Sequence, residues 1–142
     1  MITRTASARY EGFGKEGKGH VSTQSGVLAD TPYGFNTRFE NEPGTNPEEL
    51  IAAAHAACFT MALSFALAKE GLSAGTLVTT AKVKLDKEGD GFTISRSDLT
   101  LTATVAGIDE ARFRAVALDA KANCPVSKLL NAEIGFELTL TG

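Results

Sequence analysis

The sequence predicts an α+β fold in which a mostly antiparallel β-sheet wraps around one long, buried central helix. Residues 76–86 and 134–140 alternate apolar and polar side chains, which is typical of half-buried strands. Before these two runs, residues 50–68 are apolar around nearly the whole helical circumference, which favours a buried helix. The expected order is therefore strands, long helix, strands, helix and strand.

The N-terminal part, residues 3–39, is expected to form short strands separated by turns. Four glycines between residues 12 and 19 indicate a hairpin turn, and the run Thr31-Pro32-Tyr33-Gly34 is typical of a second turn. In residues 35–39 the alternation predicts a strand that places Phe35 and Phe39 on one face and Arg38 on the other.

The long helix has clear signals at both ends. Asn46 is the expected N-cap, Pro47 suits the first helical position, and Gly71 suits the C-cap. A helix of this length is close to the minimum for crossing a bilayer. Its many alanines and the central His55 favour burial within a domain or a dimer instead, so we expect no membrane contact.

After residue 86 the chain is expected to turn at Asp90-Gly91 and return as a second strand. The apolar side chains of that strand change from even to odd positions, which predicts a β-bulge near Arg96-Ser97.

A second helix is expected to begin at Asp109 and to carry Cys124 on its apolar face. Pro125 ends this helix and opens a short turn through Leu130. The members of the apolar stripe are Phe113, Val116, Ala117 and Ala120.

Composition favours one globular domain spanning residues 1–142, since 43% of the residues are hydrophobic, 22% are charged and no repeat divides the chain. A net charge of -3 without a basic block argues against nucleic acid as a partner. The polar opening has no apolar core of the secretory type, so we expect a cytoplasmic protein. Two cysteines in a reducing compartment indicate redox chemistry rather than a permanent bridge.

Cys58 is the first candidate for chemistry, although burial on an apolar helix would leave it an inert core thiol unless a cation lies nearby. Arg38 can supply that charge, held by Glu48 or Glu49 in the first turn of the long helix. Glu48 precedes Cys58 by ten positions, close to three turns, or about 15 Å along the axis. A long arginine side chain can span much of that distance.

Cys124 precedes Pro125 at the start of a short helix, where a thiolate is favoured, or else it fills a packing corner. His55 lies three positions before Cys58 and shares its helical face. It can act as the base of a Cys-His hydrolase, join Cys58 and Cys124 in a metal site, or be a hydrogen-bonded core residue. Zinc needs a further ligand, and His20 is far away in sequence, so no metal or bound cofactor is expected.

Three segments identify a resemblance that covers essentially the whole chain. They are PYGFNTRF at 32–39, TNPEELIAAAHAACF at 45–59 and CPVS at 124–127. Together they closely resemble the osmotically inducible protein C (OsmC) family, which includes the organic hydroperoxide resistance proteins. Tyr33-Gly34-Phe35 and His55 resemble the OsmC branch. The resemblance implies an OsmC-like fold and an intertwined homodimer with two active sites at the subunit interface.

The resemblance also implies the site: Cys58 as the peroxidatic cysteine, Cys124 as the resolving cysteine, Arg38 as the thiolate-stabilising residue and Glu48 as its partner. The implied function is thiol-dependent reduction of organic hydroperoxides to alcohols through a sulfenic acid and a Cys58-Cys124 disulfide, in oxidative and osmotic stress defence. An external dithiol reductant, pointing to a lipoyl-bearing protein, would reset the pair. The alternatives are a redox-sensing binding protein and a Cys-His hydrolase that uses Cys58 and His55.

Overall fold

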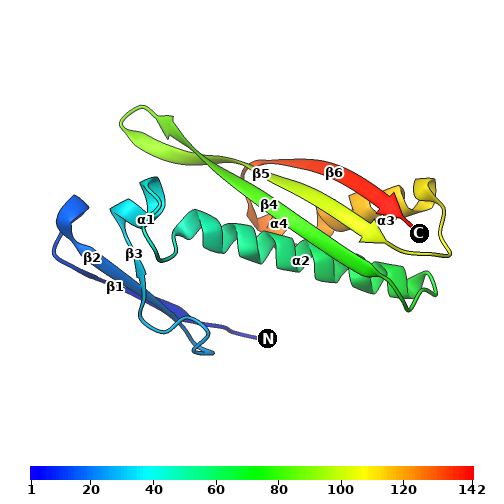
Figure 1. Cartoon of the computed structure of the whole chain (residues 1–142), viewed down its shortest axis with the longest axis horizontal. Coiled ribbons are helices and arrows are strands. Elements are labelled where there is room, and N and C mark those ends of the chain that lie inside the picture. Colours follow the sequence, from blue (N-terminus) through cyan, green and yellow to red (C-terminus); the bar gives the residue numbers. More distant parts are fainter. The chain divides into compact units, whose positions relative to one another are not determined.

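The computed structural model describes residues 1–142, which divide into two compact units, residues 1–50 and 51–142 (Figure 1). The prediction of one domain over the whole chain stays a prediction. The elements in chain order are β1 (Ala6–Glu11), a 3₁₀ turn (Gly14–Glu16), β2 (Lys18–Thr23), β3 (Thr31–Tyr33), α1 (Phe35–Phe39), α2 (Pro47–Lys69), β4 (Thr76–Glu88), β5 (Gly91–Thr104), α3 (Glu110–Asn123), α4 (Pro125–Leu129) and β6 (Glu133–Thr141).

The first unit contains an antiparallel sheet in the order β1-β2-β3. The expected glycine-rich hairpin joins β1 to β2 and is confirmed. The expected turn at Thr31-Pro32-Tyr33-Gly34 is wrong, because residues 31–33 form β3 and pair with β2. Pro32 is compatible with this strand because β3 lies at the edge of the sheet and pairs on one side only.

The strand expected over residues 35–39 is also wrong, since these residues form helix α1. The hydroxyl of Thr37 accepts a hydrogen bond from the Gly34 N–H at 2.7 Å and so satisfies one free donor at the start of the helix. Phe35 and Phe39 still share a face, with ring centroids 5.0 Å apart. Residues four positions apart meet in a helix and share a face in a strand, so this pattern does not separate the two.

Both predicted ends of α2 are confirmed. The Glu49 N–H donates to the Asn46 side-chain oxygen at 2.7 Å, and Pro47 is the first helical residue. At the other end Gly71 adopts φ +87°, and the Leu72 N–H donates to the Leu67 carbonyl at 3.2 Å. This arrangement is a Schellman cap, which needs the left-handed conformation that glycine adopts readily.

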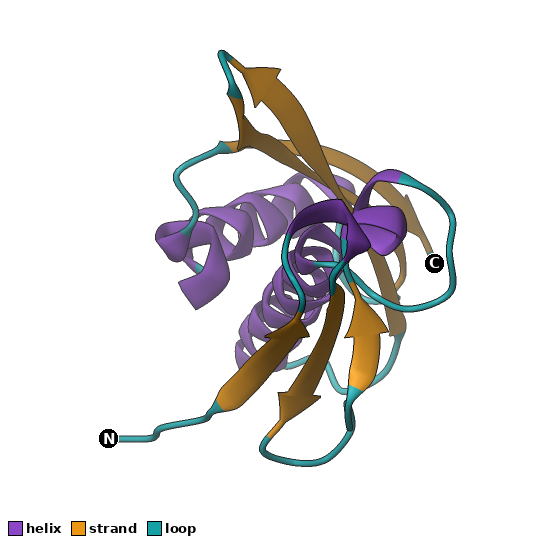
Figure 2. Ribbon diagram, turned by 90° about the vertical axis from the view of Figure 1, so that its left-hand side faces the viewer, coloured by secondary structure: helices purple, strands orange, loops and turns teal.

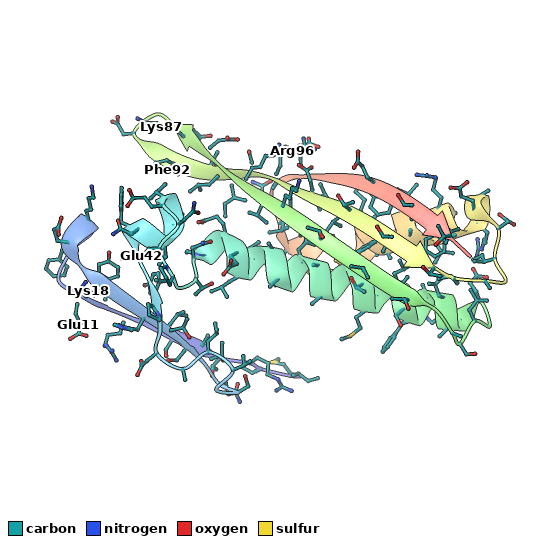
Figure 3. All side chains as sticks on the ribbon, in the orientation of Figure 1. Glu11, Lys18, Glu42, Lys87, Phe92 and Arg96 are labelled. Carbon is teal, nitrogen blue, oxygen red and sulfur yellow. The ribbon has the colours of Figure 1, made fainter.

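The second unit contains a mixed sheet in the order β4-β5-β6. Strands β4 and β5 are antiparallel, whereas β5 and β6 are parallel and are connected through α3 and α4. The hairpin turn lies at Gly89-Asp90, one residue earlier than predicted, because Gly89 takes the positive φ of +60°. Lys87 and Phe92 pair across the tip of this hairpin (Figure 3).

The predicted β-bulge is confirmed within one residue. Lys84 pairs with Arg96 and Leu85 pairs with Ile94, which leaves Ser95 as the extra residue in β5. The inserted residue moves the apolar side chains of β5 from even to odd positions.

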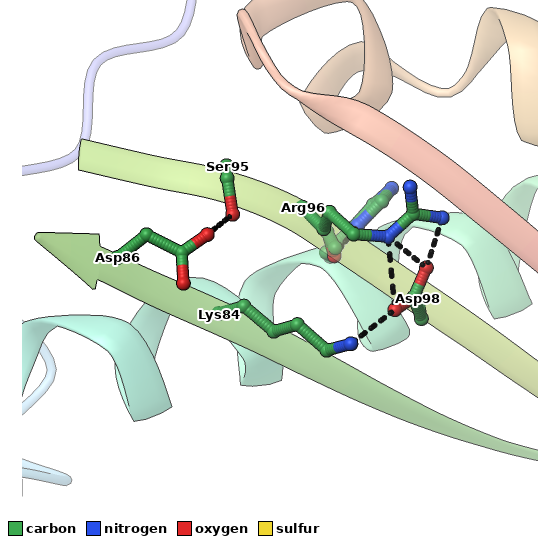
Figure 4. A network of polar contacts seen from close by, with 7 residues as sticks. Lys84, Asp86, Ser95, Arg96 and Asp98 are labelled. Carbon is green, nitrogen blue, oxygen red and sulfur yellow. Dashed lines mark hydrogen bonds and ion pairs between the residues drawn. The ribbon is translucent and has the colours of Figure 1, made fainter. Parts of the chain in front are cut away.

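A polar network covers the exposed side of this bulge (Figure 4). The Ser95 hydroxyl donates to Asp86, and the Arg96 guanidinium donates to Asp98 at 2.8 Å. The hydrogen bonds from Arg96 hold the pKa of the Asp98 carboxyl below its ordinary value. The network is a solvated surface feature of the sheet.

Helices α2 and α3 cover one face of the β4-β5-β6 sheet and form a single core with it (Figure 2). Phe59 of α2 packs edge-on against Phe136 of β6, with ring centroids 5.7 Å apart. The apolar stripe predicted for α3 is confirmed as buried. The largest fully buried apolar side chains are Phe59, Leu63, Leu99, Leu101 and Phe113.

Helix α2 buries only one of its faces in the single chain. On the opposite face Met61 and Phe65 are 61% and 67% exposed. This helix is long and apolar enough to cross a membrane. Core helices of soluble proteins can have the same length and composition, so this does not indicate a membrane span. Its stripe of Phe59, Leu63 and Leu67 lies in the core of the second unit.

Candidate functional site

The fold of the second unit brings Cys58 and Cys124 together. Cys58 is half-buried on α2, and Cys124 is buried at the junction of α3 and α4. Both are free thiols in one core, where Cys58 packs against the buried cluster that contains Cys124, and Cys124 contributes to raising the pKa of the Cys58 thiol. Two cysteines distant in sequence are therefore neighbours in the core of the second unit.

The surroundings of Cys58 within this unit disfavour its thiolate. Burial raises the pKa of the Cys58 thiol, the backbone N–H of Val126 lowers it, and the hydrogen bond and charge of Cys124 raise it again. The net direction is upward. Cys58 needs a nearby cation to become a strong nucleophile at neutral pH.

Cys124 is held by the first turn of α4, for which it serves as N-cap. The Ser127 N–H donates to the Cys124 sulfur at 3.3 Å, and the Cys124 thiol donates to the Ser127 hydroxyl at 3.1 Å. Pro125 follows at the first helical position, where its missing N–H costs nothing. The sulfur is thus fixed in direction by two contacts with one residue.

His55 lies fully buried on α2 and makes two hydrogen bonds to serine side chains. Its Nδ1 lies 2.6 Å from the Ser97 hydroxyl and its Nε2 lies 2.8 Å from the Ser127 hydroxyl. Burial lowers the pKa of His55, so the imidazole is neutral near pH 7. Both ring nitrogens are therefore occupied by serines, as in the core-residue alternative for His55.

Ser97 and Ser127 are functional candidates that the sequence analysis did not single out. Ser127 belongs to the CPVS segment and lies three residues after an N-cap cysteine, and this spacing is the signal that predicts its contact with Cys124. Ser97 has no comparable signal. No group of three or more His, Cys, Asp or Glu side chains is placed to hold a metal ion.

Arg38 and Glu48 form a bidentate ion pair in the first unit. Arg38 Nε and Nη2 donate to the two carboxylate oxygens of Glu48, each at 2.9 Å. Glu49, the other candidate partner, instead accepts a hydrogen bond from the Thr45 hydroxyl at 2.8 Å. Of the two carboxylates, Glu48 is the one that orients the guanidinium.

An apolar pocket of about 390 Å³ opens beside Arg38 in the first unit. Four aromatic residues line it, and Lys15 lies 5.0 Å from the ring centroid of Phe35. The aromatic lining consists of Tyr10, Tyr33, Phe35 and Phe39. Such a pocket suits an alkyl or aryl group next to a fixed positive charge. Arg38 belongs to the first unit and Cys58 to the second, and their meeting in one site stays a prediction.

Comparisons with known proteins agree with this architecture. The family model described as "OsmC-like protein" matches residues 39–139. The chain is 53% identical to the peroxiredoxin OsmC of Escherichia coli K12 over 98% of this chain and 97% of that protein. It is 32% identical to the organic hydroperoxide resistance protein OhrA of Bacillus subtilis, covering 97% and 94% of the two chains. The crystal structure of OhrB from the same organism has a TM-score of 0.72 at 32% identity and covers 97% and 98%.

Proposed function

Because this chain belongs to the OsmC family, we propose that it is a cysteine-based peroxidase that reduces organic hydroperoxides to alcohols. The observation that carries the proposal is the contact between two free thiols, Cys58 and Cys124, supplied by separate elements of one core. The names of the relatives support it, since one is a peroxiredoxin and others confer resistance to organic hydroperoxides.

The first step is an attack of the Cys58 thiolate on the terminal oxygen of the hydroperoxide. The sulfur–oxygen bond forms as the oxygen–oxygen bond breaks, and the leaving alkoxide takes up a proton to give an alcohol. Cys58 becomes a sulfenic acid. Arg38, held by Glu48, supplies the positive charge that offsets burial of the thiolate and stabilises the developing alkoxide.

The second step joins the two cysteines. Cys124 attacks the sulfenic sulfur of Cys58, a disulfide forms and water leaves. The influence of Cys124 on the pKa of the Cys58 thiol supports this step, because it shows that the two side chains are neighbours. An external dithiol, for which a lipoyl-bearing protein is our candidate, then reduces the disulfide. The protein itself needs no bound cofactor for this cycle.

The pocket beside Arg38 accounts for a preference for organic peroxides. Its aromatic walls favour an alkyl or aryl tail, which hydrogen peroxide lacks. Arg38 and Lys15 are the charged residues of the lining, so a tail against the aromatic walls has a positive charge nearby for its peroxide group. The substrate class is therefore a hydroperoxide with an apolar substituent.

A second copy of the chain is the expected occupant of the exposed face of α2. Met61 and Phe65 lie four positions apart on this face, and alanines flank them. Two such apolar faces can pack against each other, in keeping with the homodimer that the family resemblance implies. Sedimentation velocity should give a dimer for the wild type and a monomer for Phe65→Glu, and a monomeric wild type would contradict the dimer.

Steady-state turnover separates this function from its alternatives. Reduced protein is mixed with cumene hydroperoxide and an excess of dihydrolipoamide, and the cumyl alcohol formed per subunit is counted. Many alcohol molecules per subunit are expected from a peroxidase. A redox-sensing binding protein, which acts in stress defence without turnover, would form one alcohol molecule per subunit and then stop. A Cys-His hydrolase would leave the hydroperoxide unreacted, and this alternative also lacks support because Ser97 and Ser127 occupy both nitrogens of His55.

A further inference from the structure

A buried chain of hydrogen bonds reaches the sulfur of Cys124 and has no part in the cycle described so far. It runs from the Cys124 thiol to the Ser127 hydroxyl at 3.1 Å and from there to His55 Nε2 at 2.8 Å. It ends at the Ser97 hydroxyl, 2.6 Å from His55 Nδ1. Three elements contribute, namely α2, β5 and the first turn of α4.

We propose that Ser127 and His55 form a proton relay that activates Cys124 for disulfide formation. In this relay Ser127 touches the reacting thiol and is a catalytic residue, whereas His55 acts through Ser127 and is a positioning residue. The inference rests on the proposed peroxidase function and concerns its second step alone.

The hydrogen bonds assign a direction to the relay. The Ser127 oxygen accepts the thiol proton of Cys124, so its own single proton points to His55 Nε2. Nε2 is then the acceptor, and the ring proton resides on Nδ1 and is donated to Ser97. Burial lowers the pKa of His55, which keeps the imidazole neutral and leaves its Nε2 lone pair free to accept.

The burial of Cys124 explains why an internal proton acceptor is needed. The residue is only 1% exposed, so bulk water has little access to the sulfur. The backbone N–H of Ser127 already donates to this sulfur and stabilises a negative charge there. One residue thus offers both an acceptor for the proton and a donor for the resulting thiolate.

The reaction balances as follows. Cys124 gives its proton to the Ser127 oxygen while Ser127 passes its own proton to His55 Nε2. The Cys124 sulfur attacks the Cys58 sulfur, the sulfur–sulfur bond forms and the sulfur–oxygen bond of the sulfenic acid breaks. The departing hydroxide takes up the proton that the relay has received and becomes water. One thiol and one sulfenic acid give one disulfide and one water, and the relay returns to its starting state.

Stopped-flow kinetics with cumene hydroperoxide can measure the two steps separately. The first is the second-order formation of the Cys58 sulfenic acid, followed with a sulfenic-acid-trapping probe. The second is the first-order formation of the Cys58-Cys124 disulfide, followed by rapid alkylation and mass spectrometry. The variants are Ser127→Ala, Ser127→Thr and His55→Asn, with the exposed Ser73→Ala as the matched control.

Ser127→Ala should slow disulfide formation about 10- to 100-fold, because a positioned acid–base group contributes at least this much. Formation of the sulfenic acid should stay within about twofold of wild type, and Ser127→Thr, which restores the hydroxyl, should recover most of the lost rate. His55→Asn should slow the same step and carries the test if Ser127→Ala does not fold. Ser73→Ala should match the wild type in both steps.

Two results would overturn the relay. Disulfide formation at the wild-type rate in Ser127→Ala would show that Cys124 needs no hydroxyl acceptor. Equal slowing of both steps, without recovery in Ser127→Thr, would show that the hydrogen bonds only maintain the local structure. In both cases the proposed function survives, since Cys58 still forms a sulfenic acid. If Cys58 of the wild type forms none, the proposed function fails and the relay with it.

Discussion

Arg38 and Glu48 are joined by two parallel hydrogen bonds, each 2.9 Å long, between the guanidinium and the carboxylate. The side chain of Glu48 is 11% exposed and that of Arg38 is 34% exposed, so the carboxylate is the buried anchor and the guanidinium faces outward. A bidentate pair fixes the plane of the guanidinium as well as its position. The positive charge at the pocket is therefore preorganised before any substrate binds.

Replacing Arg38 tests whether this charge acts on Cys58. Arg38→Ala should slow the oxidation of Cys58 by cumene hydroperoxide about 10²- to 10³-fold, as expected for loss of a positioned donor to a developing oxyanion. Arg38→Lys should recover only a small part of the lost oxidation rate, because lysine lacks the planar guanidinium that makes two parallel hydrogen bonds. The second-order rate constant measures this, with the exposed Arg9→Ala as control. An unchanged rate and thiol titration in Arg38→Ala would remove Arg38 from the mechanism.

Removing Cys124 should lower the pKa of Cys58. The hydrogen bond of Cys124, and its charge when it is ionised, both favour the neutral thiol of Cys58, so Cys124→Ala takes away two upward contributions. The pKa of Cys58 is measured from the pH dependence of the rate at which iodoacetamide alkylates the reduced protein. Cys124→Ser keeps a hydrogen-bonding group and should lie between wild type and Cys124→Ala. A higher Cys58 pKa in Cys124→Ala would contradict the assigned contact.

His55 should make the protein sensitive to mild acid. Its pKa in the folded protein lies below the ordinary value of about 6.5, so the unfolded chain binds a proton that the folded chain does not. The contribution of His55 to stability is therefore fully present above about pH 6.5 and is lost as the pH falls below that value. The melting temperature should fall less between pH 7.5 and pH 5.5 in His55→Asn than in wild type. The control variant His20→Asn should show the same decrease in melting temperature as wild type. An equal decrease in wild type, His55→Asn and His20→Asn would contradict this account.

The aromatic pocket predicts a measurable substrate preference. Turnover should be faster with cumene hydroperoxide than with hydrogen peroxide. Phe35→Ala should raise the KM for the organic substrate about tenfold, the value of one apolar contact of this size, with little effect on hydrogen peroxide. Phe13→Ala is the matched control, since this ring is 94% exposed and does not line the pocket. Equal or higher efficiency with hydrogen peroxide would refute the role of the pocket.

The sequence predicted the fold correctly where a structural feature depends on residues close together in the chain. Asn46 and Asp109 cap the helices that the sequence assigns to them, and a change of parity locates the bulge at Ser95. The same reasoning misassigned residues 35–39, because Phe35 and Phe39 share a face in both a helix and a strand. It also did not anticipate the parallel pairing of β6 with β5.

The candidate site divides in the same way. Short-range spacing placed the partner of Arg38 in the first turn of the long helix but left Glu48 and Glu49 both open; the family resemblance implied Glu48, which the ion pair confirms. The link between His55 and Ser127 joins residues 72 positions apart, and nothing local in the sequence requires it. Long-range hydrogen bonds of this kind depend on how α2 and α4 pack against the sheet, which propensity and capping do not determine.

The central claim is that Cys58 and Cys124 are one redox couple, and disulfide mapping tests it most directly. Reduced protein is treated with one equivalent of cumene hydroperoxide, its free thiols are counted and its peptides are mapped by mass spectrometry, with Cys58→Ser and Cys124→Ser as controls. We expect both thiols to disappear into a Cys58-Cys124 bridge, and a sulfenic acid to be trapped at Cys58 in Cys124→Ser. Survival of both thiols in folded wild-type protein would contradict the account.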